Sequence, residues 1–64
     1  MNQKELNEIW RRHKAEENYG ADLRVTETRD LQIIEKQIDG NREAWERKKE
    51  DEDWEQVPPL GGNL

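Results

Sequence analysis

Residues 31–48, LQIIEKQIDGNREAWERK, are compatible with two different structures, and the architecture of the whole chain depends on which one forms. In a helix, apolar residues and one Asn recur at alternating spacings of three and four, which is the pattern of a heptad seam: Leu31, Ile34, Ile38, Asn41 and Trp45. The Glu, Lys and Arg residues that follow are good helix formers. A helix is therefore the first interpretation of this segment.

The same segment can instead form a β-hairpin, because the Asp-Gly pair at 39–40 is a common turn between antiparallel strands. Ile34 then lies opposite Trp45, a favourable cross-strand pair. Against the hairpin, two consecutive Ile residues interrupt the alternation, and residues 42–55 contain no β-branched residue. We predict a mainly α fold, as a small helical hairpin or three-helix arrangement; the alternative is one helix plus a small antiparallel β-meander.

On the N-terminal side, residues 2–19 are predicted to form an amphipathic helix. Asn2 is a suitable N-cap, and Glu5 follows at the spacing of a capping box. Gly20 is suited to end this helix in a left-handed conformation. Residues 21–29 carry a weak period-two pattern, which predicts a short extended connector or an edge strand. The apolar face of the helix is formed by Leu6, Ile9, Trp10 and His13.

On the C-terminal side, residues 58–64, PPLGGNL, are predicted to form an extended tail. Two prolines favour an extended path, and the Gly pair makes the backbone flexible. We therefore expect one small helical domain over residues 1–57, followed by this tail. The side chains expected to be most buried are Leu6, Ile9, Trp10, Ile34, Ile38 and Trp45.

The composition restricts the chemistry that the chain can perform. It has 64 residues, of which 42% are charged and 30% hydrophobic, and a chain of this size cannot enclose a large catalytic cleft and also bury a core. The absence of Cys excludes disulfides and thiolate metal sites. With no Ser and a single His, no nucleophile can be paired with a base and an orienting group. We expect no catalytic residues, no metal site and no cofactor.

The charge and the ends of the chain indicate the kind of partner. The formal net charge is −5, and the basic residues are interleaved with acids, so we expect no direct binding of nucleic acid. The chain shows neither the apolar run of a signal peptide nor the roughly 18 apolar residues of a membrane span, so we expect a cytoplasmic protein with no membrane partner. Because apolar residues are scarce, we also expect a homo-oligomer.

The candidate binding site is the acidic run at residues 50–55, EDEDWE, which places five carboxylates in six residues. At the C-terminus of a helix these acids oppose the macrodipole, which suggests a role other than helix stability. Such a row can occupy a basic surface on another protein and imitate the spacing of phosphates. Trp54 belongs to a residue type that is enriched in interface hot spots. The partner-binding candidates are Glu50, Asp51, Glu52, Asp53, Trp54, Val57 and Leu60.

These observations predict a small acidic protein, not an enzyme, that binds another protein as an inhibitor, adaptor or nucleic-acid mimic. Its size and acidity are common among phage and mobile-element products. The partner is expected to present a basic surface. The alternative is a structural or assembly component that self-associates through the heptad seam of residues 31–45.

Overall fold

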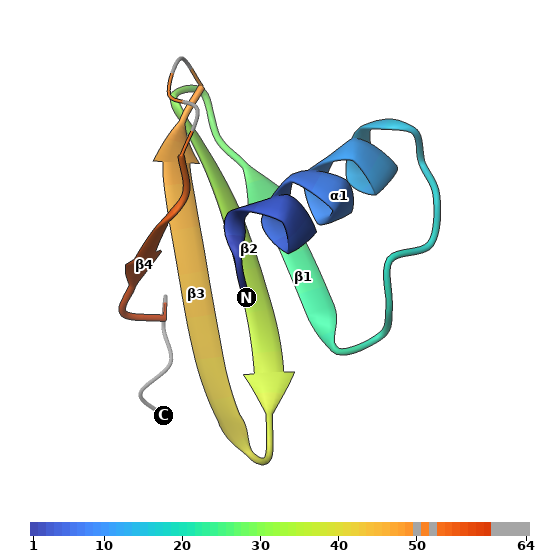
Figure 1. The fold of residues 1–64 in the computed structure, drawn as a ribbon, viewed down its shortest axis with the longest axis vertical. Coiled ribbons are helices and arrows are strands. Elements are labelled where there is room, and N and C mark those ends of the chain that lie inside the picture. The colour runs from blue at the N-terminus through green and yellow to red at the C-terminus, as the bar shows by residue number, and fades with distance from the viewer. Residues whose placement is uncertain (50, 52, 60–64) are drawn as a thin grey trace.

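The computed structural model describes residues 1–49, 51 and 53–59. The strands form one antiparallel sheet in the order β1-β2-β3-β4, and the helix lies across one face of it (Figure 1). No helix in these residues is long and apolar enough to cross a membrane. The elements are α1 (Gln3–Lys14), β1 (Leu23–Glu27), β2 (Leu31–Ile38), β3 (Asn41–Lys48) and β4 (Glu55–Val57).

The prediction of a mainly α fold is wrong, and the alternative of one helix with an antiparallel meander describes the structure. Residues 31–48 form β2 and β3, which are paired in the register that sets Ile34 opposite Trp45. Asp39 and Gly40 have φ values of +48° and +80°, the left-handed conformations that a two-residue hairpin turn requires. The expected heptad seam of a helix therefore does not form.

The two adjacent isoleucines explain why β2 lacks the alternation of apolar and polar residues that is expected of a strand. Ile33 is 4% exposed and Ile34 is 0% exposed, although neighbouring residues of a strand point to opposite faces of the sheet. A central strand that is buried on both faces needs apolar residues on both, so the alternation disappears. The poor strand propensity of β3 is overcome because Ala44 and Trp45 are both buried in the sheet.

Helix α1 begins as predicted and ends earlier than predicted. The side chain of Asn2 accepts a hydrogen bond from the backbone of Glu5, and the Glu5 side chain accepts one from the backbone of Asn2, which completes the capping box. At the other end, the backbone N–H of Glu17 donates to the carbonyl of Arg12 across Glu16, whose φ is +59°. The helix thus ends at Lys14, well before Gly20.

The core lies between α1 and the sheet, and it contains one residue that was not expected there. Trp54, which follows β3 in the chain, is 3% exposed and packs in this core. Trp10 and Ile38 were expected to be among the most buried residues, yet both are only half-buried. The buried core cluster consists of Leu6, Ile9, Ile34, Trp45 and Trp54. Strand β4 ends at Val57, and residues 60–64 of the expected tail lie outside the described residues.

The core predicts the effect of two substitutions in β2. Ile34→Ala should lower the free energy of unfolding by about 2–5 kcal/mol, because it opens a cavity at a fully buried position. Ile38→Ala is the matched control and should have a clearly smaller effect, since Ile38 is half-buried at the end of the strand. Urea denaturation of both variants measures the difference. Equal losses of stability would contradict this description of the core.

Candidate functional site

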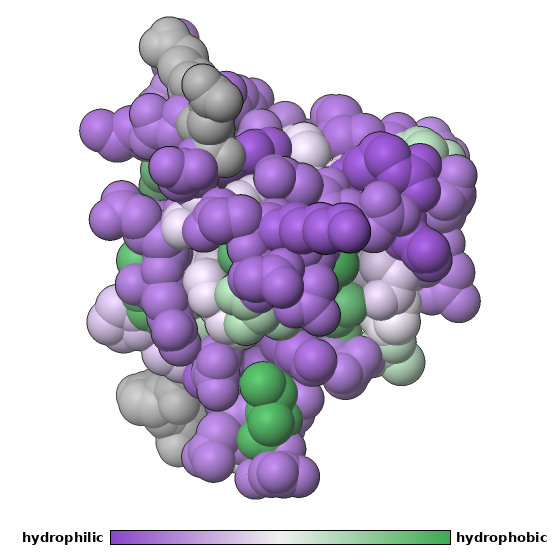
Figure 2. All heavy atoms as spheres, in the orientation of Figure 1, coloured by the Kyte–Doolittle hydropathy of each residue, from purple (hydrophilic) through white to green (hydrophobic). Residues whose placement is uncertain are grey.

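A groove lies on the helix-covered face of the sheet, where α1 leaves part of that face open. A helix of 12 residues is about 18 Å long, and it crosses the sheet while the hairpin of β2 and β3 extends beyond it (Figure 1). The cavity has a volume of about 530 Å³ and opens to solvent. Figure 2 shows hydrophobic atoms exposed on this face below α1, among hydrophilic neighbours.

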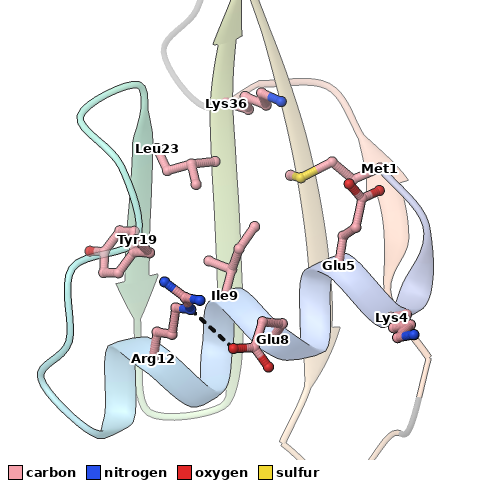
Figure 3. A pocket seen from close by; sticks show the side chains of 9 residues that line it. All are labelled: Met1, Lys4, Glu5, Glu8, Ile9, Arg12, Tyr19, Leu23 and Lys36. Atoms are coloured by element: carbon pink, nitrogen blue, oxygen red, sulfur yellow. Dashed lines mark hydrogen bonds and ion pairs between the residues drawn. The ribbon is translucent and has the colours of Figure 1, made fainter.

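The groove has an apolar floor and a charged rim (Figure 3). Ile9 projects into it from α1, Leu23 projects from β1, and Tyr19 comes from the loop that joins these two elements. Met1 completes the apolar lining. The rim consists of Lys4, Glu5, Glu8, Arg12 and Lys36.

The acidic side chains of the rim are already engaged within the protein. Glu5 accepts the capping-box hydrogen bond at 3.1 Å. The carboxylate of Glu8 accepts hydrogen bonds from Arg11 at 2.7 Å and Arg12 at 3.0 Å, and these bonds lower the pKa of Glu8 from 4.5 to about 2. The negative charge of Glu8 is therefore offset before any ligand arrives, whereas Glu5 has a backbone hydrogen bond and no ion pair with a described residue.

Two ammonium groups of the rim form no ion pair with any described residue. Lys4 lies in the first turn of α1, and Lys36 lies on β2. Neither forms an ion pair within 4 Å in the described part of the chain, although Glu43 is the cross-strand neighbour of Lys36. The groove thus combines apolar surface with uncompensated positive charge.

The residues predicted to bind a partner lie elsewhere. Asp51 and Asp53 are exposed on the connection between β3 and β4, and Val57 is half-buried at the end of β4. Glu50, Glu52 and Leu60 lie outside the described residues. The structure places Asp51, Asp53 and Val57 near the β4 edge of the sheet and not in the groove.

The structure adds one carboxylate, that of Glu46, to this acidic region. Glu46 in β3 is the cross-strand partner of Glu55 in β4, so two acids stand directly opposite each other. Like charges at such positions destabilise a sheet. Neither carboxylate belongs to an ion pair with another described residue. The sequence could not reveal this pair, because it depends on the register of β4.

Trp54 occupies the core, so it is not exposed as the predicted partner anchor. Its backbone N–H donates to the side-chain oxygen of Gln3 at 2.7 Å, and the Gln3 amide donates to the Trp54 carbonyl at 2.8 Å. Its indole N–H donates to Asn7 at 3.0 Å, and the guanidinium of Arg47 lies 4.4 Å from its ring. Burial lowers the pKa of Arg47. This network holds the beginning of α1 against the segment that leads into β4.

Two other titratable side chains lie in unusual surroundings. His13 is half-buried between the rings of Trp10 and Tyr19, with centroids at 5.3 and 6.0 Å. Glu35 is 4% exposed on the face of the sheet opposite the groove, and its Oε2 has no hydrogen-bond partner among the described residues. Its nearest cation is Arg24 at 4.0 Å. In the described residues, no three His, Asp or Glu side chains converge to hold a metal ion.

Sequence reasoning missed the groove, because its residues come from the N-terminus, α1, a loop and two strands. The one available signal was Lys36, a charged residue at an inward position of the hairpin alternative, on the same face as Ile34. Comparisons with protein-family models, curated proteins and solved structures returned no match.

The two hydrogen bonds between Gln3 and the backbone of Trp54 predict a loss of stability when the Gln3 side chain is removed. Gln3→Ala deletes two hydrogen bonds and leaves backbone groups of Trp54 without partners, so the free energy of unfolding should fall by about 1–3 kcal/mol. Thermal or urea denaturation followed by Trp fluorescence measures this change. Gln37→Ala, at an exposed position of β2, is the matched control. A loss of stability no larger than that of the control would show that the hydrogen bonds between Gln3 and Trp54 do not stabilise the fold.

The contacts of Glu8 predict a specific dependence on pH. Because its pKa is lowered on folding, this carboxylate stabilises the fold above about pH 4.5, and its contribution is lost as the pH falls toward 2. An NMR titration should place the Glu8 carboxyl pKa near 2 and show a return toward 4.5 in the Arg11→Gln/Arg12→Gln variant. Glu8→Gln should flatten the pH dependence of unfolding in that window. An unshifted Glu8 in the native protein would refute this prediction.

Proposed function

We propose that this chain is a small non-enzymatic binding module that acts in the cytoplasm as an inhibitor or adaptor of another protein. The groove between α1 and the sheet is its binding surface. The single observation that carries the proposal is the combination of an open apolar floor with a charged rim in one cavity of about 530 Å³. Protein interfaces have this anatomy, with an apolar centre and a polar periphery.

The form of the groove favours a protein segment over a small substrate. The cavity opens to solvent, so it can accept a side chain presented by a larger surface. Tyr19 contributes an aromatic ring of the kind that is enriched at interface hot spots. The rim supplies hydrogen bonds and charge, and no nucleophile paired with a base lies among its residues.

A second candidate surface is the acidic edge at β4. Asp51, Asp53 and Glu55 are exposed there, and Glu46 faces Glu55 across the strands. A basic protein surface would relieve this repulsion, as expected for a nucleic-acid mimic. The two candidates differ in location, so a partner can be assigned to one of them by where it makes contact.

Site-specific cross-linking in the host cell tests the two surfaces. A photoreactive residue replaces Leu23 in the groove, Asp51 at the acidic edge, or Glu16 on the loop after α1. Capture of one identified protein from position 23, and not from 16 or 51, is the expected result. Capture from position 51 alone would transfer the function to the acidic edge and overturn the groove.

The binding of the captured protein is then measured with purified components. Leu23→Lys should weaken binding by at least tenfold, because it places a charge on the apolar floor. Leu31→Lys is the matched control, since Leu31 is also half-buried but lies on the opposite face of the sheet. Equal effects of the two substitutions would show that the groove is not the contact surface.

A further inference from the structure

We propose that the groove also binds the acidic edge segment of a second copy, residues 53–58, so that the chain associates head to tail. This inference rests on the proposed function only in using the same groove. It names a copy of the chain itself as an occupant, and it makes assembly compete with the binding of other proteins.

The first step is the chemistry that the groove requires of its occupant. The floor is apolar, and three charges of the rim form no ion pair with a described residue: the ammonium groups of Lys4 and Lys36 and the carboxylate of Glu5, so cations exceed anions among the unpaired groups. An occupant that is apolar and also carries carboxylates complements both features. A basic occupant would meet these two cations and be repelled.

The second step is that the chain itself presents such a segment. Asp53 and Glu55 are exposed and form no ion pair with other described residues. Pro58 is exposed directly after β4, next to the half-buried Val57. Proline in an extended path packs well on aromatic rings, and Tyr19 supplies one in the groove.

The third step is that this segment is already held in an extended form. Trp54 is anchored in the core through Gln3 and Asn7, and β4 is paired with β3 from Glu55 to Val57. Little conformational entropy is therefore lost when a second copy binds it. The approach of two ammonium groups also relieves the repulsion between Glu46 and Glu55.

The topology makes this contact intermolecular. The pairing of β4 with β3 holds residues 55–57 at the edge of the sheet opposite β1, whereas Leu23 of β1 lines the groove (Figure 1). The segment of one copy therefore cannot enter its own groove while the sheet is intact. Two different surfaces meet in this interface, so the association is heterologous and extends into rings or chains.

Sedimentation over a hundredfold range of concentration tests the proposal. The native chain should show an average mass that rises with concentration. Lys4→Glu/Lys36→Glu and Asp53→Lys/Glu55→Lys should each weaken association by at least tenfold, because each places like charges in the interface. A chain with all four substitutions should associate again, since the charges are exchanged and its formal net charge returns to −5.

Matched controls separate this interface from a general effect of charge. Arg42→Glu/Lys48→Glu changes the net charge as much as the groove variant, at exposed positions on the other face of the sheet, and should leave association intact. Circular dichroism checks the fold of every variant. If reversal at Lys36, opposite Glu43, unfolds the chain, Lys4→Gln/Lys36→Gln replaces it and should also weaken association.

A native chain that remains monomeric throughout would overturn the proposal, as would a folded four-substitution chain that fails to associate. Cross-linking from position 23 to a different protein, by a chain that never self-associates, would refute this inference and support the proposed function. Self-association through the groove, with no other protein captured, would support this inference and refute the proposed function.

Discussion

The burial of Trp54 between α1 and the sheet is the interaction on which the rest of this small structure depends. Residues 51 positions apart in the chain are joined there, because Gln3 hydrogen-bonds both backbone groups of Trp54. Arg47 covers the indole ring, and Asn7 accepts the indole N–H. A chain with so few apolar residues gains an indole in its core by this route, and the network satisfies the polar groups that are buried with it.

The same anchor explains why the groove stays open. It holds the first turn of α1 near the segment that enters β4, and the capping box begins the helix at that point. The helix is then too short to cover the whole face, so the sheet beyond it keeps an apolar floor exposed. Filling this space would require a longer helix or a larger side chain. The groove is therefore a consequence of where the helix is fixed and how soon it ends.

Some charged side chains of the protein form ion pairs, whereas others form none with the described residues. Glu8 and Glu27 each contact two basic side chains, and these contacts lower the pKa of both carboxyls. At the groove and at the β4 edge, by contrast, ammonium and carboxylate groups remain without ion pairs among the described residues. Surface ion pairs contribute little stability, so their absence costs the fold little and leaves these groups available for binding.

The sequence by itself determined the start of α1, because Asn2 and Glu5 interact locally, and it also determined the absence of disulfides and the acidic net charge. Only the tertiary structure decided that residues 31–48 are strands, since the burial of Ile33 and Ile34 on opposite faces appears once β2 has a neighbour on each side. The groove and the burial of Trp54 were decided in the same way. Each depends on contacts between residues distant in the chain, whereas periodicity and capping report only neighbours within one element.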